Sequence, residues 1–354
     1  FMDGIPLIPT PEAIPAPWPV FEVLGVLLFM LHILFINVVL GGSLLAFFSK
    51  APRENGAASA IYKKIPSTLA IGVTLGVAPL LFLQVLYGHL IYSSSVLMAL
   101  YWLLVIPLLI IAYYGTYIHA RSAVNWLGRT AIGLAALIFL YITFIYSNNM
   151  TLMLQPEKWS AYFTNRSGTI LNLSDPALWP RYLHFVIASV AVAGLFSSLV
   201  WQIRARKGVP GSGEEVRKGL RIFAIATSVQ VAVGIWFLIA LPRDFMLAFM
   251  GGNLLYTLIL VVGIILAIGA LVLAFLGKFW PTFWHLIALT LVMVLNRLAL
   301  RDLYIGRFFK VSELTLKPQY DLLILFVIIL LIGLAAVWYM VRTMISASEG
   351  RESL

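Results

Sequence analysis

Residues 20–48 read VFEVLGVLLFMLHILFINVVLGGSLLAFF, and this stretch decides the class of fold. It contains one carboxylate, Glu22, and neither Lys nor Arg. About 20 apolar residues in a row cross a lipid bilayer as an α-helix. The alternation of apolar and polar residues that marks a membrane β-strand is absent. The stretch therefore predicts a membrane-spanning helix.

Eight further apolar stretches follow, each bounded by charges, Pro or Gly. The nine expected spans are about 20–48, 66–91, 96–119, 129–148, 180–203, 219–241, 247–276, 280–300 and 320–343. The composition agrees, because 62% of the 354 residues are hydrophobic and only 11% are charged. A soluble domain carries about 25% charged residues, so a water-soluble enzyme is excluded. We expect an all-α polytopic membrane protein in a lipid bilayer.

The basic residues predict the orientation of the chain. Fifteen of the 24 Lys and Arg fall on one side of the expected spans and nine on the other. Cytoplasmic loops carry the excess of Lys and Arg, so we expect the N-terminus outside and the C-terminus inside. The expected location is the cytoplasmic (inner) membrane of a bacterium or archaeon. The net charge of +10 is assigned to these loops and not to nucleic-acid binding.

We expect a single transmembrane domain over residues 20–343. Residues 1–19 would form an outer N-terminal segment, and residues 344–354 an inner tail. Residues 149–179 would form an outer cap loop rich in aromatic residues and turn formers, and residues 204–218 a charged, Gly-rich inner linker. Because so little of the chain leaves the bilayer, any water-soluble step is expected on partner subunits.

Histidine is the residue type that points to chemistry in this sequence. All five histidines lie in or beside the expected spans. An ionisable side chain inside a membrane costs free energy and by default marks a functional site. Imidazole is also the usual axial ligand of non-covalent haem, whereas a structural histidine would make an interhelical hydrogen bond. With no cysteine, the chain cannot hold an iron–sulfur cluster or a covalent c-type haem.

His32 and His184 are the candidate ligands of haem iron. His32 lies in the first span among apolar residues, and His184 lies near the outer end of the fifth span. One turn from His184, Arg181 could pair with a haem propionate through charge-assisted hydrogen bonds. Ala188 and Ala191 follow on the same helix and are small enough to face a macrocycle. For both histidines the alternative is a structural hydrogen bond or simple helix packing.

The other three histidines are weaker candidates. We expect His89 at the shallow end of the second span, as a headgroup-level residue or as a contact of haem or quinone. His119 is expected to snorkel to the inner interface. His285 lies between Trp280 and Trp284, and a structural role is expected for it.

The run HILFINVVLGGSLL, which begins at His32, resembles the first helix of cytochrome bd quinol oxidase subunit I. In the same order, residues 72–88 resemble the next helix of that family, and residues 221–228, RIFAIATS, resemble the start of its sixth helix. Tyr182-Leu183-His184 falls where the family keeps the histidine of its low-spin haem b. The resemblance covers about half of the chain. It implies that His32 ligates a high-spin haem and His184 a low-spin haem b.

The chain departs from the family at several positions. Gln84 stands where the family has a glutamate near the high-spin haem, and Leu295-Asn296-Arg297 stands where another ligating glutamate would be expected. Met246 and Met250 are the nearest candidates for the methionine partner of the low-spin haem. These replacements remove ligand and proton-path groups together, which disfavours oxygen reduction.

Basic residues near the outer surface extend the predicted site. Residues 297–317 carry five Lys and Arg on the side that should be poor in them. We expect Arg297 or Arg301 to pair with haem propionates, and Arg307, Lys310 and Lys317 to face an acidic partner protein.

The resemblance and its departures together imply a haem b-containing electron-transfer subunit of a respiratory complex. It would exchange electrons between the quinone pool and a partner redox protein, such as a periplasmic multihaem cytochrome c. As an enzyme it would be a quinol-oxidising or quinone-reducing subunit. The alternatives are a haem-free anchor or scaffold subunit of a redox complex, and a divergent bd-type terminal oxidase.

Overall fold

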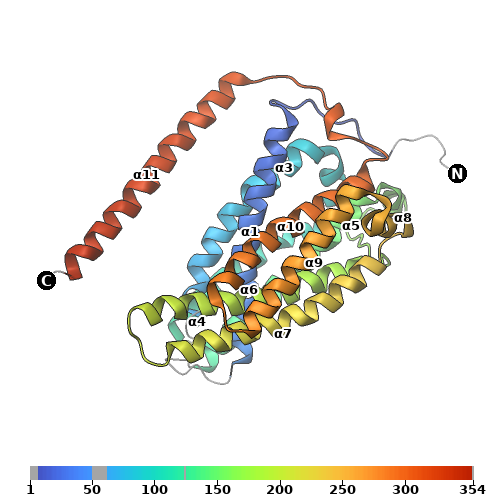
Figure 1. The fold of residues 1–354 in the computed structure, drawn as a ribbon. Coiled ribbons are helices and arrows are strands. Elements are labelled where there is room, and N and C mark those ends of the chain that lie inside the picture. The colour runs from blue at the N-terminus through green and yellow to red at the C-terminus, as the bar shows by residue number, and fades with distance from the viewer. Residues whose placement is uncertain (1–6, 50–61, 123–124, 353–354) are drawn as a thin grey trace.

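The computed structural model describes residues 7–49, 62–122 and 125–352, with side chains as far as residue 343. These residues form an all-α polytopic membrane protein (Figure 1). Within the described ranges, nine helices are long and apolar enough to cross a membrane, as the hydropathy pattern predicts. The β-structure of the same ranges is a single bridge between Ile14 and Leu316.

The described residues contain nine long helices. They are α1 (Trp18–Phe48), α3 (Ile65–Leu97), α4 (Ala99–Ser122), α5 (Trp126–Leu154), α6 (Leu178–Arg206), α7 (Ser212–Ile239), α9 (Leu254–Phe275), α10 (Phe279–Ile305) and α11 (Tyr320–Glu352). The shorter elements are η1 (Pro156–Phe163), α8 (Arg243–Leu247), η2 (Ala248–Gly252) and η3 (Val311–Glu313). The helices extend into both expected loops, so only residues 207–211 separate α6 from α7.

The bundle has two ends, which we name by their connections. The cap end carries residues 155–177, α8 and the connection from α10 to α11. The linker end carries residues 207–211 and the turn between α9 and α10. The candidate haem ligands His32 and His184 lie on the cap-side halves of α1 and α6.

Small residues allow the central helices to approach closely. A Cβ atom at Gly41 of α1 would overlap the backbone carbonyl of Ser189 on α6. A Cβ atom at Gly219 of α7 would overlap Ser198 of α6 in the same way. Close approach through glycine is the usual basis of helix packing in membranes, where apolar side chains gain little by leaving lipid. These contacts place α6 between α1 and α7.

Helix α11 stands apart from the rest of the bundle (Figure 1). None of the side chains in its Tyr320–Thr343 span is buried. The segment before it is nevertheless held at the cap end, because Ile14 N donates to Thr315 O and Lys317 N donates to Ile14 O, both at 2.9 Å. Helix α11 therefore adds nothing to the core that positions the candidate site.

The orientation of the bundle in the membrane stays a prediction from the basic residues, and a reporter experiment tests it. A fluorescent reporter that matures only in the cytoplasm should be active after Leu354, which lies outside the described residues. The same reporter inserted after Gly168, at the cap end, should be silent. The reverse pattern would place the cap end in the cytoplasm.

Candidate functional site

Three arginines on α6 and α10 form what we call the arginine cluster: Arg181, Arg297 and Arg301. Arg181 is buried, with 9% exposure, and Arg297 is close enough to the other two for their charges to repel. Among the described residues, Arg301 is the member of this cluster that forms an ion pair, between its Nη2 and Glu22 Oε1 at 3.6 Å. Buried cations cost free energy unless they are paired, so the cluster is electrostatically suited to an anion.

Each of the three guanidinium groups also contacts an aromatic ring. The distances to the ring centroids are 5.3 Å for Arg181 over Phe237, 4.4 Å for Arg297 over Phe29 and 4.3 Å for Arg301 over Tyr87. The Nε atoms of Arg181 and Arg301 are buried and have no hydrogen-bond partner among the described residues. A cation–π contact stabilises the positive charge of a guanidinium group but does not use its N–H donors, which point outward in the guanidinium plane. The cluster therefore retains donors for an acceptor.

The structure connects the arginine cluster to both predicted haem ligands. Phe237, which lies under Arg181, has its ring centroid 6.5 Å from that of His184. Phe29, which lies under Arg297, has its centroid 6.2 Å from that of His32. Each histidine therefore shares an aromatic neighbour with an arginine of the cluster.

His184 is held between α6 and α7. Gln230 Nε2 of α7 donates to the backbone carbonyl of His184 at 3.0 Å. A Cβ atom at Gly234 would lie 3.6 Å from His184 Cε1, so this glycine leaves room beside the ring. The Nδ1 atom of His184 is buried without a partner among the described residues. An unsatisfied buried nitrogen costs free energy, and ligation of a metal would satisfy an imidazole nitrogen.

His32 connects α1 to α3. Its Nδ1 lies 2.7 Å from the carbonyl oxygen of Gly72. A Cβ atom at Gly76 would lie 2.5 Å from His32 Cε1, so the glycine is needed for the ring to fit. Donation from one ring nitrogen to a carbonyl is usual for a metal-ligating histidine, because it leaves the other nitrogen as the ligand. The same bond is also the interhelical hydrogen bond of the structural alternative.

His89 is not at the end of its span, because α3 continues to Leu97. The helix is interrupted just before it, at Tyr87 (φ −133°, ψ 26°). The His89 ring packs edge-on against Phe309, with centroids 4.6 Å apart, and its Nε2 is buried without a partner among the described residues. At this irregular turn, Tyr87 lies under Arg301 of the arginine cluster. His89 follows Tyr87 by two residues.

The expectation that His119 snorkels to the interface is wrong. The side chain is only 3% exposed, and its Nδ1 lies 2.9 Å from the carbonyl oxygen of Gly128 on α5. Gly128 lies in the first turn of α5, nine residues after the histidine, so this contact joins the linker-side ends of the two helices. His285 Nδ1 lies 2.9 Å from Pro281 O, one turn earlier on its own helix.

The methionine candidates lie before the seventh long helix, which begins at Leu254 and not at residue 247. Met246 is on α8 and packs against the same hydrophobic cluster as Phe237. Met250 is in η2, where the backbone leaves helical geometry, and its side chain is 61% exposed. Met246 therefore packs against the cluster that also contacts Phe237, the aromatic neighbour of His184. Gln84 is partly buried on α3.

Sequence reasoning missed the aromatic residues that join the histidines to the arginines. Phe29 is three residues before His32, which is one helical turn, so its position was recoverable from the sequence. Phe237 comes from α7, and only tertiary packing brings it to His184. Sequence reasoning also missed a second polar contact at the cap end, in which Tyr256 Oη donates to Asp302 Oδ2 at 2.6 Å.

Within the described ranges, no group of three or more His, Asp or Glu side chains gathers in a way that could hold a bare metal ion. No protein-family model, curated protein or solved structure matches this chain. The site is therefore interpreted from its own residues.

Proposed function

We propose that this chain is a haem b-bearing membrane subunit that exchanges electrons between the quinone pool and a partner redox protein. The observation that carries the proposal is the arginine cluster, in which Arg181 and Arg297 share aromatic neighbours with His184 and His32. A haem has two propionate carboxylates and an iron that accepts axial imidazole nitrogens. The site offers arginines for the propionates and histidines for the iron.

The residues present fit a haem in two respects. The buried Nδ1 of His184 and the buried Nε atoms of Arg181 and Arg301 have no partners among the described residues. His184 and His32 would hold iron, and Arg181 together with Arg297 or Arg301 would hold propionates through charge-assisted hydrogen bonds. A bound haem b would supply one-electron transfer.

The cap end also supplies groups for the proton chemistry of quinol. Oxidation of a quinol to a quinone releases two electrons and two protons. Glu22, held by Arg301, and Asp302, held by Tyr256, are carboxylates at this end of the bundle. Asp302 is exposed near the cap end of α10. We assign these two carboxylates as the proton acceptors.

The partner would dock on the cap end. Arg307, Lys310 and Lys317 are exposed there, and the Arg307 pair with Glu157, at 3.9 Å, is half exposed on both sides. A basic surface of this kind favours an acidic partner such as a periplasmic multihaem cytochrome c. With the cap end outside, the protein would lie in the cytoplasmic membrane of a bacterium or archaeon.

A haem-free anchor or scaffold subunit is the second candidate. The observation that favours it is the hydrogen bond between His32 and Gly72, which satisfies that histidine nitrogen within the chain. A divergent bd-type terminal oxidase ranks third, because Gln84 cannot ligate iron or carry protons as a glutamate does.

A pyridine haemochrome spectrum of the purified protein tests the proposal. We expect the spectrum of haem b, at one or more haems per chain. A preparation that is folded and free of haem would support the scaffold function. Oxygen consumption with a reduced quinol as the only electron donor would support the oxidase.

A further inference from the structure

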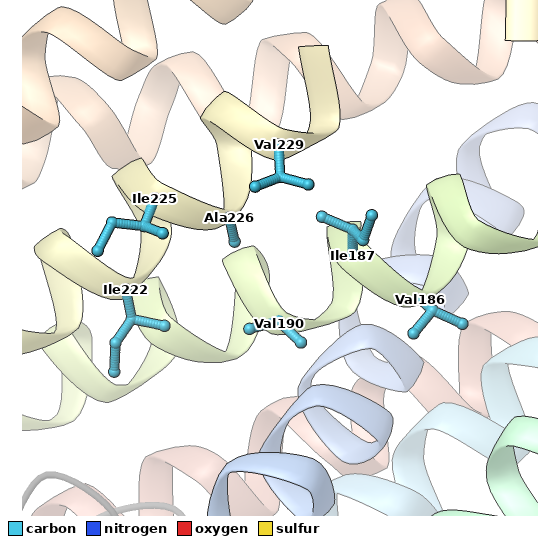
Figure 2. Close-up of a pocket in the computed structure, with 7 residues that line it drawn as sticks. All are labelled: Val186, Ile187, Val190, Ile222, Ile225, Ala226 and Val229. Carbon is cyan, nitrogen blue, oxygen red and sulfur yellow. The ribbon is translucent and has the colours of Figure 1, made fainter. Parts of the chain in front are cut away.

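A groove runs between α6 and α7 (Figure 2). Val186, Ile187 and Val190 of α6 line one wall, and four residues of α7 between Ile222 and Val229 line the other. Its volume is about 330 Å³, and every lining side chain is aliphatic. Ile225 and Val229 are 56% and 48% exposed, so the groove opens at the surface of the described residues, where a spanning helix would meet lipid.

The groove ends on the linker side where the two helices touch. There Gly194 and Gly219 face each other, and Ser198 Oγ donates to the carbonyl of Val216 at 2.9 Å. Beyond this contact, towards the linker end, come Arg204 and Arg206 of α6 and Arg217 of α7. The apolar groove therefore leads towards a charged surface.

One row of side chains on α7 connects the charged surface to the groove. Arg217, Arg221, Ile225 and Val229 follow one another at intervals of four residues, which places them along one ridge of the helix. The two arginines are exposed and form no ion pair at contact distance among the described residues, although Glu214 lies within electrostatic reach of Arg217. The nearby Glu214 and Glu215 both contact Lys218, at 3.0 and 2.8 Å.

Two like charges one turn apart on a helix repel each other, and an anion between them removes the repulsion. A phosphate group accepts hydrogen bonds from two arginines with good geometry. Basic residues beside a membrane-spanning helix attract anionic lipid headgroups in particular. Arg217 and Arg221 are therefore placed to hold a lipid phosphate.

The dimensions fit a single lipid. Val229 is eight residues beyond Arg221, or about 12 Å along the helix axis at about 1.5 Å per residue. The hydrocarbon of one leaflet is about 15 Å thick, half of the bilayer core. An acyl chain whose headgroup lies at Arg221 would therefore run the length of the groove within one leaflet.

We propose that the groove between α6 and α7 binds one anionic phospholipid, with its phosphate on Arg217 and Arg221 and one acyl chain against the aliphatic walls. The site is independent of the haem proposal, because its residues belong to neither histidine nor the arginine cluster. The two arginines would recognise the charge of the headgroup, and the aliphatic walls would accept an acyl chain of matching length.

The proposal is tested by native mass spectrometry of the detergent-purified, delipidated protein titrated with defined lipids. Dioleoyl phosphatidylglycerol should bind with a stoichiometry of one and should raise the unfolding temperature. Three control ligands should bind more weakly. Dioleoyl phosphatidylcholine lacks the net negative charge, dihexanoyl phosphatidylglycerol has chains that are too short, and inorganic phosphate has no acyl chain. If phosphatidylcholine bound equally well, the headgroup would not be recognised by its charge. If the short-chain lipid or inorganic phosphate bound equally well, the acyl chain would not contribute to binding.

Two pairs of variants separate the headgroup from the chain. Arg217→Gln with Arg221→Gln should weaken phosphatidylglycerol binding roughly 25-fold, about fivefold per charge. Arg121→Gln with Arg129→Gln removes equal charge at the same end of the bundle and should leave the binding unchanged. Val229→Trp should block the chain, whereas Val231→Trp, on another face of α7 and 40% exposed, should not. Unchanged binding in both test variants, or a small apolar polypeptide retained in the groove, would refute the lipid assignment.

Discussion

Replacing His184 with alanine is expected to remove bound haem b while the protein still inserts into the membrane. An axial ligand forms a bond to iron that alanine cannot make. Loss of a residue that merely orients a ligand already costs about 10–100-fold in metal affinity, so loss of the ligand itself should cost at least as much. The haem-to-protein ratio after purification, from the pyridine haemochrome, measures the effect. Quinol-dependent electron transfer should be lost with it.

His119→Ala is the matched control for this experiment. His119 is also buried, and its Nδ1 also lies against a backbone carbonyl, but it is at the linker end, away from the arginine cluster. It should leave the haem content unchanged, so that a loss in His184→Ala is not a general effect of emptying a buried histidine site. Full haem content with an unchanged spectrum in His184→Ala would contradict the ligand assignment.

Replacing Arg297 with methionine is expected to change two properties in opposite directions. Haem retention should fall about 10–100-fold, because charge-assisted hydrogen bonds to a carboxylate contribute about 1.5–3 kcal/mol. The haem-free protein should become more stable, since the variant removes a charge that two other arginines repel. Thermal unfolding of protein produced under haem starvation, followed by titration with haem, measures both.

Arg307→Met is the control for the arginine cluster. Arg307 is an exposed arginine at the same end of the bundle, and its contact with Glu157 is long and solvated. An exposed pair of this kind contributes at most about 1 kcal/mol, so neither stability nor haem retention should change appreciably. If Arg297→Met instead destabilised the haem-free protein, Arg297 would be a structural residue and not a propionate ligand.

Much of the fold could be predicted from the sequence because its main signal is local. The thickness of the bilayer requires long apolar runs, and residues 20–48 and the eight later runs can each be recognised without knowing their neighbours. The same reasoning selects the histidines as candidates, because an ionisable residue in an apolar run is conspicuous in the sequence itself. Loop boundaries were less accurate, since α5, α6 and α7 continue past their apolar cores.

The sequence by itself therefore determined an all-α membrane protein with nine spanning helices and a short set of candidate ligands. Only the tertiary structure decided which of them share a site. It brought Arg181 and Arg297 together from helices more than a hundred residues apart, and it buried His119, which the sequence placed at the surface. The reason is physical: hydropathy shows how deep a residue lies along its helix but not which neighbouring helix it faces. That choice depends on where small residues such as Gly41 and Gly219 allow two backbones to approach.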